Sequence, residues 1–308
     1  MKRLLQTLLA TITVLSVMAF GQADKPKIAL IMKTLSNEYF IAMKEGADKA
    51  AKEQNIDLIV QVAEKEDSTE QLVSLVENMI ASKVDAIIVT PNDSHAFVSV
   101  FNDSEKAGIP IIDLDVELDK DAAKSAGLTY YYVGVNNFEG GYKSAKRLVD
   151  ELGGKGKIVI LEGIPGVDNG EQRKAGAMKA FSEAAGIEVV ASQTANWETE
   201  QALNVMTNIL TANPDVVGVF AANDNMAIGA ITAIENAGLE GKVLVSGYDA
   251  LPLALQYIKE GKMLNTIDQG PGAQAAKGLE FAVKRIKKEE VPERFYQDLI
   301  VIDKSNVQ

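Results

Sequence analysis

The sequence predicts an α/β protein in which parallel sheets are covered by helices on both faces. Short apolar runs rich in β-branched residues alternate with segments whose apolar residues recur every three or four positions. Polar side chains follow several of these runs closely, and in a doubly wound sheet ligands bind at the ends of the strands. These side chains are Lys33, Asp115, Arg173, Asn223 and Asp249. The pattern is that of a ligand receptor.

The first strands and helices are predicted from the spacing of their apolar residues. Residues 27–32 predict a strand, and residues 37–54 predict a helix because their apolar side chains lie three or four positions apart. Residues 56–62 predict the second strand. Ser68 and Gln71 then have the spacing of a capping box, which predicts the start of a second helix.

Further strands are predicted from short β-branched runs, mostly separated by helical periods. They cover residues 84–90, 109–114, 131–135, 157–161, 187–191, 216–220 and 242–245. The end of the chain adds a strand pattern from residue 263, a helix to about residue 288 and a strand over 297–302. These last two strands need partners, and they could return the chain between two lobes.

The number of strands indicates more than one sheet. A single sheet holding all of them would be large, and the chain is long enough for two domains with their own cores. The interval 119–129 interrupts the alternation of strands and helices. A boundary between two lobes is therefore expected there.

The first residues predict a secretory signal peptide. Lys2 and Arg3 precede an uncharged run over residues 4–20, and Gly21-Gln22-Ala23 follows, so cleavage is expected after Ala23. The alternative is a membrane anchor, but the run is at the short limit for spanning a bilayer. The chain has no cysteine that could carry a lipid after cleavage. These features predict a soluble protein of the periplasm.

Charge and composition exclude several classes of function. The 31 basic and 43 acidic residues give a net charge of −12, and loss of Lys2 and Arg3 with the signal would make it −14. This charge disfavours nucleic acid and anionic lipid as partners. The absence of cysteine excludes a disulfide framework and thiolate catalysis. With His95 as the single histidine, expected in the first turn of a helix, we expect no metal site and no cofactor.

Eight segments along the chain place polar and aromatic residues beside apolar runs. They are residues 33–40 (KTLSNEYF), 90–94 (TPNDS), 113–115 (DLD), 163–173 (GIPG through Arg173), 191–197 (ASQTANW), 221–227 (AANDNMA), 247–249 (GYD) and 266–269 (TIDQ). In this order the chain resembles the periplasmic sugar-binding proteins of the ribose and allose type, which serve ATP-driven importers. The resemblance implies two Rossmann-like lobes, joined by three hinge crossovers, that close on a monosaccharide.

The resemblance also implies how the lobes divide the chain. Residues 24–135 and 270–298 are expected to form the N-terminal lobe, and residues 136–269 and 299–308 the C-terminal lobe. Residues 1–23 are the expected signal peptide.

Three aromatic side chains match the family's sugar-stacking positions: Tyr39, Phe40 and Trp197. A sugar ring presents C–H patches on its faces, which aromatic plates can cover. The alternative for each is a place in the core, and for Phe40, on the apolar stripe of a helix, the two are evenly balanced. Trp197 follows Ala195-Asn196 in a predicted loop, which favours a ligand contact.

Six further residues match the family's hydrogen-bonding positions. These are Asn37, Asp115, Arg173, Asn223, Asp249 and Gln269. A carboxylate accepts from two adjacent hydroxyls, a guanidinium donates a planar fork, and an amide does both. The alternatives are a helix cap for Asn37, a solvated helix face for Arg173 and a turn for Asp249.

Two positions bear on the identity of the sugar. Lys33 stands where allose-type members carry Lys and ribose-type members carry a small hydroxyl residue. Val116 follows Asp115 where the ribose type has Arg and the allose type Glu, so a polar contact with the ligand is missing. Either the ligand lacks a hydroxyl there, or water or another residue supplies the contact.

The sequence therefore predicts a receptor with no catalytic residues. It would capture a monosaccharide (an allose-like aldohexose, another hexose or a related polyol) and deliver it, as a monomer, to the membrane permease of an ABC importer. One alternative is an exported carbohydrate-acting enzyme with Asp115 and Asp249 as its carboxylate pair, but Arg173 and Lys33 would hold both carboxylates ionised. A second alternative is a sugar sensor for a chemoreceptor. A repressor of the same fold would need a DNA-reading helix pair where the signal peptide stands.

Overall fold

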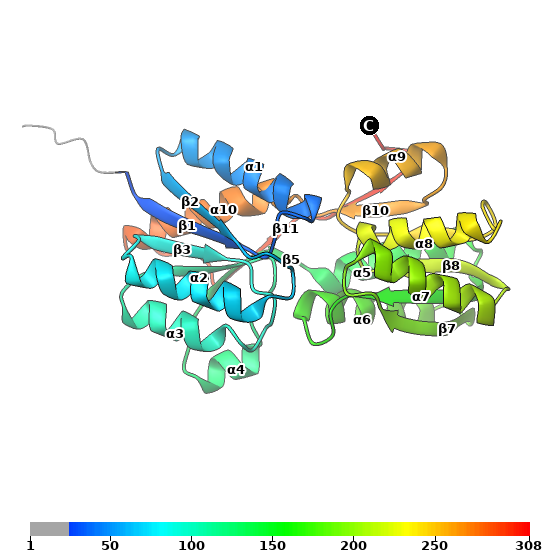
Figure 1. Cartoon of the computed structure of the whole chain (residues 1–308), viewed down its shortest axis with the longest axis horizontal. Helices are drawn as coiled ribbons and strands as arrows, with labels where there is room; N and C mark the ends of the chain where they lie inside the picture. The colour runs from blue at the N-terminus through cyan, green and yellow to red at the C-terminus, as the bar shows by residue number, and fades with distance from the viewer. Residues whose placement is uncertain (1–24) are drawn as a thin grey trace, which may run out of the picture.

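The first lobe is formed around one six-stranded sheet in the computed structural model, which describes residues 25–308 (Figure 1). Its strands are β1 (Lys27–Met32), β2 (Asp57–Val62), β3 (Ala86–Val89), β4 (Ile111–Leu114), β5 (Tyr131–Val135) and β11 (Arg294–Gln297). Its helices are α1 (Glu38–Glu53), α2 (Thr69–Ala81), α3 (Val98–Lys106), α4 (Lys120–Ser125) and α10 (Pro271–Ile286).

The second lobe repeats this arrangement with a second six-stranded sheet. Its strands are β6 (Lys155–Glu162), β7 (Gly186–Thr194), β8 (Val216–Ala221), β9 (Leu244–Ser246), β10 (Asn265–Asp268) and β12 (Ile300–Asp303). Its helices are α5 (Asn137–Glu151), α6 (Asp168–Ser182), α7 (Thr199–Ala212), α8 (Asp224–Asn236) and α9 (Pro252–Glu260).

Both sheets have the strand order of a doubly wound fold. The orders are β2-β1-β3-β4-β5-β11 and β7-β6-β8-β9-β10-β12, so each starts as 2-1-3-4-5. All neighbouring strands are parallel except β10 and β12. The predicted α/β class with parallel sheets between helices is confirmed. In such a sheet the ligand site lies where the order reverses, between β1 and β3 or between β6 and β8.

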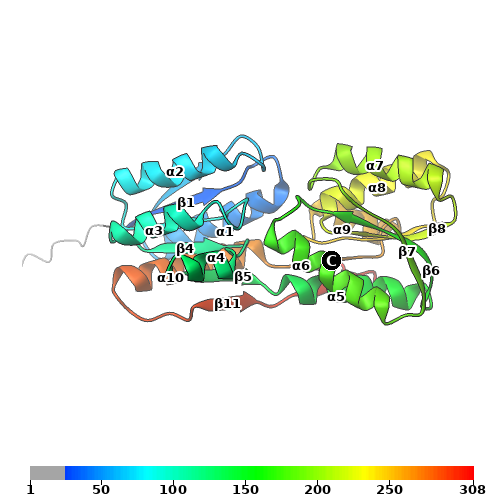
Figure 2. The ribbon, with the colours of Figure 1, turned by 90° about the horizontal axis from the view of Figure 1, so that it is seen from below.

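Alternation along β1 explains why helices cover both faces of the sheet. Ile28 and Leu30 belong to one apolar cluster, and Ala29 and Ile31 belong to another. Successive side chains of a strand point to opposite faces, so both faces are apolar and must be covered. Figure 2 shows α2 and α10 on opposite sides of this sheet.

Helix α10 joins the first lobe although it follows β10 of the second. It packs against α1 at Gly46 and Gly272, where a Cβ on Gly46 would lie 2.2 Å from the Gly272 Cα atom. Three connections pass between the lobes: β5 to α5, β10 to α10, and β11 to β12. The third is short, because only residues 298 and 299 separate its strands.

Three sequence predictions are wrong in detail. The run 297–302 is not one strand, because β11 pairs with β5 while β12 pairs with β10. The interval 119–129 is not a boundary between lobes. It holds α4, capped by Asp119, and β5 then pairs with β4.

The third difference is the capping box. Ser68 stands at the N-cap of α2 without a side-chain hydrogen bond to the helix. Gln71 Oε1 instead accepts from the Glu64 backbone N–H at 3.0 Å, so its side chain fixes the β2–α2 loop.

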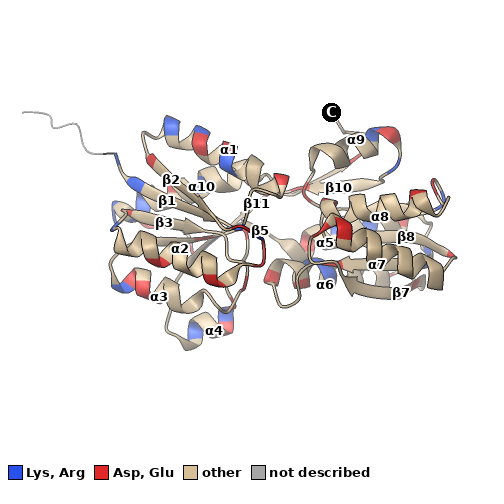
Figure 3. Ribbon diagram, viewed as in Figure 1, with Lys and Arg blue, Asp and Glu red and all other residues tan. Residues whose placement is uncertain are grey.

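Lys, Arg, Asp and Glu residues are spread over the helices of both lobes (Figure 3). Among residues 25–308, no helix combines the length and apolar character needed to cross a bilayer. The predicted signal peptide lies outside the described residues.

Asp224, at the start of α8, ties together the ends of three strands in the second lobe. Its carboxylate accepts from the Leu251 N–H at 2.9 Å and from the Thr266 hydroxyl at 2.8 Å, and its own N–H donates to the Tyr248 carbonyl at 2.7 Å. The side chain is fully buried, and burial raises the pKa of Asp224 from its ordinary 3.8 to about 7.

The raised pKa of Asp224 predicts a stability that falls as pH rises. Between pH 3.8 and about 7 the folded state keeps a proton that the unfolded state releases. The stabilisation is complete below about pH 4 and is lost as pH approaches about 7, by roughly 4 kcal/mol in all. Asp224→Asn, neutral throughout, should gain roughly 2 to 3 kcal/mol relative to wild type between about pH 5 and about pH 8 in urea unfolding. A pH-independent difference between the two proteins would contradict this assignment.

Candidate functional site

A cavity between the two lobes brings together all ten predicted site residues. It holds about 270 Å³ of space not filled by protein atoms, a volume that includes space open to solvent. Its lining residues are Lys33, Asn37, Tyr39, Phe40, Glu66, Asp115, Asn169, Arg173, Trp197, Asn223, Asp249 and Gln269. Glu66 and Asn169 were not predicted.

The cavity lies at the carboxyl ends of the strands of both sheets. Lys33 follows β1 directly, and Asp115 follows β4; Asn223 and Gln269 come just after β8 and β10. The two lobes therefore face each other with the edges where doubly wound sheets bind ligands.

Arg173 reaches the cavity from a different position than expected. It lies in α6 and not close after a strand, and it is only 3% exposed, so the alternative of a solvated helix face is wrong. Its guanidinium donates to Asn137 Oδ1 at 2.9 Å and to the Ala222 carbonyl at 3.0 Å. It also lies 3.8 Å from the centroid of the Tyr248 ring. The arginine is thus held from three sides before any ligand binds.

Arg173, Asp249 and Gln269 form one buried polar network. Arg173 Nη1 lies 3.7 Å from Asp249 Oδ1, which accepts from Gln269 Nε2 at 2.7 Å. Burial acts to lower the pKa of Arg173, but the electrostatic influence of Tyr248, Asp249 and Asp115 outweighs it, and the pKa is raised. The guanidinium therefore stays charged.

The electrostatics of Asp249 differ from the prediction. Burial raises the pKa of its carboxyl well above the ordinary value, although Arg173 acts against the shift. This raised pKa runs against the expectation that Arg173 and Lys33 hold the Asp249 carboxylate ionised. Desolvation outweighs the neighbouring positive charge.

Asp115 is fixed by tyrosines of the first lobe. Tyr39 Oη donates to Asp115 Oδ1 at 2.8 Å, and Tyr132 Oη donates to the Asp115 carbonyl at 3.1 Å. The Asp115 N–H donates to the Val133 carbonyl at 2.9 Å. These bonds hold Asp115 at φ 73°, a left-handed conformation that non-glycine residues seldom adopt.

Two other site residues share this strained backbone. Trp197 has φ 68° and Asp249 has φ 116°. Each such residue costs about 1 to 3 kcal/mol and persists only where the surroundings impose it. Together with Asp115, they lie at the cavity wall. The surrounding protein therefore orients these three side chains at a cost in stability.

Lys33 is buried at the cavity and lacks a partner in the protein. It is 2% exposed, and within residues 25–308 no hydrogen bond or ion pair reaches its Nζ atom. The Nζ atom lies 5.6 Å from the centroid of the Phe40 ring. A buried ammonium needs hydrogen-bond acceptors, so this group is available to a ligand.

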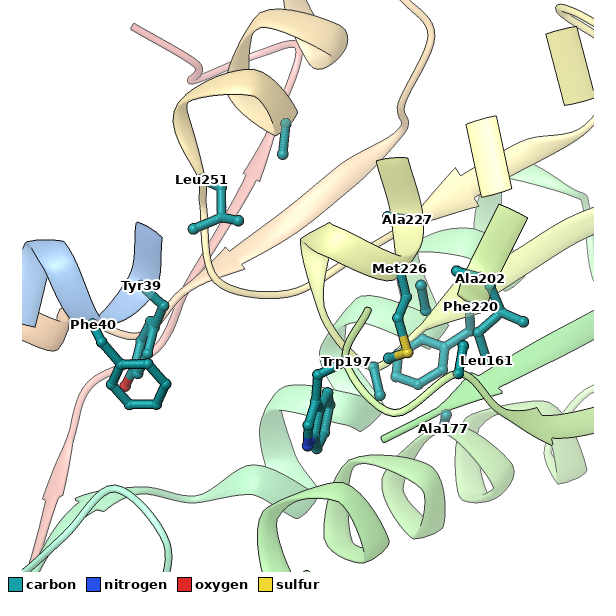
Figure 4. Packing of buried hydrophobic residues seen from close by; sticks show 14 of the residues in the cluster. Tyr39, Phe40, Leu161, Ala177, Trp197, Ala202, Phe220, Met226, Ala227 and Leu251 are labelled. Atoms are coloured by element: carbon teal, nitrogen blue, oxygen red, sulfur yellow. The ribbon is translucent and has the colours of Figure 1, made fainter. Parts of the chain in front are cut away.

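The aromatic residues face the cavity from opposite lobes. Figure 4 shows Tyr39 and Phe40 together on α1, with Trp197 opposite them. Trp197 also packs closely on its own lobe, because a Cβ on Gly163 would lie 1.9 Å from its ring. All three side chains belong to the apolar cluster as well as to the cavity wall, so the core role and the ligand-facing position coexist.

Asn37 and Asn223 each cap a helix while lining the cavity. Asn37 Oδ1 accepts from the Tyr39 N–H at 3.1 Å, and Asn223 Oδ1 accepts from the Met226 N–H at 2.9 Å. The cap oxygen is thereby fixed, and each Nδ2 amino group is oriented by the helix start.

Val116 does not contribute to the cavity wall. Its side chain is fully buried and is absent from the lining residues.

Among residues 25–308, no three His, Asp or Glu side chains are grouped as a metal site requires.

The two unpredicted residues carry weak sequence signals. Glu66 lies in the polar β2–α2 loop, where a charged residue is expected to be solvated. Asn169 lies in the first turn of α6, and its Oδ1 accepts from the Gly170 N–H at 2.8 Å. Glu66 follows β2, which is the signal its position offered, and Asn169 lies within segment 163–173, one of the eight that carry the resemblance.

Comparison with known proteins agrees with this architecture. The periplasmic binding protein domain family matches residues 28–290. The D-allose-binding periplasmic protein of Escherichia coli is 36% identical over 271 residues, covering 87% of this chain and 86% of that protein. The D-ribose/D-allose-binding protein of Pseudomonas aeruginosa is 35% identical over 263 residues, covering 85% and 82%.

A solved structure is more similar still. An ABC transporter periplasmic solute binding protein from Actinobacillus succinogenes, crystallised with bound D-allose, is 69% identical to this chain. It covers 91% of this chain and 98% of its own, with a TM-score of 0.89. The predicted resemblance is confirmed: the chain belongs to the periplasmic binding proteins, among the sugar-binding members that serve ABC importers and are not enzymes.

Proposed function

We propose that this protein captures D-allose, or a closely related monosaccharide, and delivers it to the permease of an ABC importer. The observation that carries the proposal is one cavity lined from both lobes by charged, amide and aromatic side chains. The Actinobacillus succinogenes relative with bound D-allose supports the choice of sugar.

The ten predicted residues would contact different parts of the sugar. Tyr39, Phe40 and Trp197 would cover the faces of the ring. The charged and amide groups would bind its edge. Asp115 and Asp249 would accept from hydroxyls, and Lys33 and Arg173 would donate to them.

Binding would require the lobes to open and close. The lobes cover the charged side chains of the cavity wall, which are 2 to 3% exposed at Lys33, Asp115 and Arg173, so a ligand would enter by separation of the lobes at the three crossovers. We propose residues 24–135 with 270–298, and 136–269 with 299–308, as the two moving bodies. The closed form, a monomer exported by cleavage after Ala23, would dock on the permease in the periplasm; a chemoreceptor is a second candidate partner.

A thermal-shift panel tests the ligand. D-Allose at about a thousandfold above its dissociation constant should add about 4 kcal/mol of stability by mass action, a large rise in melting temperature. Ribose, other aldohexoses, deoxy sugars and polyols in the same panel rank the alternatives. No shift with any of these compounds would refute the proposed function.

Closure predicts a change of shape. Small-angle scattering should give a smaller radius of gyration for the saturated protein than for the protein freed of ligand. The same radius in both states would count against the hinge.

Lys33→Met separates binding from folding. The substitution keeps an unbranched, apolar stem one atom shorter and removes an ammonium whose hydrogen bonds to a ligand are worth about 1.5 to 3 kcal/mol. Sugar affinity measured by calorimetry should fall about 10- to 100-fold. The melting temperature without sugar should stay the same or rise, because a buried charge without a partner is removed. Lower stability with unchanged affinity would place Lys33 in the fold and not in the site.

A further inference from the structure

The β2–α2 loop, residues 63–68, carries a cavity-lining carboxylate to which the ten predicted contacts assign no role. Glu66 lies in this loop and lines the cavity together with Lys33 and Asn37. No resemblance or comparison assigns it. Its backbone and side chain are both held by other parts of the first lobe.

The loop is anchored on two sides. Asn92 Nδ2, from the segment after β3, donates to the Glu66 carbonyl at 3.0 Å. Gln71 Oε1 accepts from the Glu64 N–H at 3.0 Å. Asn92 is itself buried, so it fixes the loop from inside the protein. These contacts set where the Glu66 carboxylate lies.

The carboxylate has hydrogen-bonding capacity left at the cavity. Within residues 25–308, its one donor is Asn37 Nδ2, which is 3.4 Å from Oε2. A carboxylate has about four acceptor positions. Burial raises the pKa of Glu66, while the charge of Lys33 and the bond from Asn37 act to lower it. The negative charges of Asp115 and of Glu198, the latter from the second lobe, raise it further.

We propose that Glu66 is a specificity-determining residue whose carboxylate accepts a hydrogen bond from a ring hydroxyl on the sugar edge beside Lys33. Asn92 is the positioning residue that holds it there. The proposal rests on the proposed sugar-binding function. Position 116 offers no polar side chain to the cavity, because Val116 is buried and absent from its wall, whereas Glu66 supplies an acceptor from the β2–α2 loop.

Specificity follows from what happens when the hydroxyl is missing. A sugar that lacks this group, or carries it on the other face of the ring, leaves a half-buried carboxylate without its partner. Sites built to bind a hydroxyl reject analogues that lack it far more strongly than apolar pockets reject an extra group. Glu66 should therefore distinguish one position of the ring and no other.

The experiment measures calorimetric affinities of D-allose and each of its monodeoxy analogues for wild type and Glu66→Gln. In the wild type, removal of one particular hydroxyl should weaken binding more than the loss of a hydrogen bond between two uncharged groups would. In Glu66→Gln, D-allose should bind about 10- to 100-fold more weakly, and the penalty at that one position should shrink at least tenfold. Penalties at the other positions should not change.

Two controls keep the result interpretable. Glu64→Gln changes an exposed carboxylate two residues away in the same loop and should leave every affinity unchanged. Melting of the sugar-free proteins verifies that Glu66→Gln is folded.

Asn92→Ala tests the positioning role. It should reduce discrimination at the same ring position in the wild-type background and have no further effect on it in the Glu66→Gln background. A purely structural role would instead weaken all analogues equally in both backgrounds, and would remove Asn92 from the proposal.

The outcomes distinguish this proposal from the one on which it rests. If the wild type binds neither D-allose nor any other sugar, the proposed function fails. If the wild type binds D-allose but Glu66→Gln shows the same penalty at every position, the role of Glu66 is overturned and the proposed function stands. An equal loss for all analogues would likewise overturn it, since it would show an effect on closure without specificity.

Discussion

The buried charge of Arg173 is the constraint on which the site depends. A guanidinium removed from water costs several kcal/mol unless it is paired and hydrogen-bonded. The structure meets this cost with Asn137, the Ala222 carbonyl, the Tyr248 ring and Asp249. These partners come from α5, from the end of β8 and from the loop after β9. Because all of these groups bond or contact Arg173 of α6, the arginine fixes the relative positions of four elements of the second lobe at the cavity.

The two lobes differ in how far the charged groups at the cavity have partners within the protein. In the second lobe the charged network is largely satisfied within the protein. In the first lobe Lys33 has no partner among residues 25–308, and the Glu66 carboxylate has one long hydrogen bond. The second lobe thus presents a preorganised surface, and the first presents groups that gain partners when a ligand arrives.

The sequence predicted correctly those features that depend on a periodic pattern of residues. It did not predict those that depend on burial in the folded protein, or on which of two nearby partners a side chain bonds. The bounds of β1 and β5 followed from their apolar runs. The ten cavity residues were found because a resemblance set their positions, yet Arg173 was misplaced because distance along the chain does not reveal a helix turning inward. Gln71 bonded a loop N–H instead of closing a capping box, since two local partners compete for it. Glu66 and the raised pKa of Asp249 depend on burial, which no local pattern encodes.

The order of the strands has a consequence for synthesis on the ribosome. The first sheet is complete only when β11 joins the edge of β5, and α10 and β11 are made after β10 of the second sheet. The chain emerges from its N-terminus, so a nascent first lobe carries an open strand edge at β5 while most of the other lobe is translated. The second sheet lacks just β12 at that stage. The half that begins first is therefore finished almost last, and its edge at β5 stays unpaired until β11 is made.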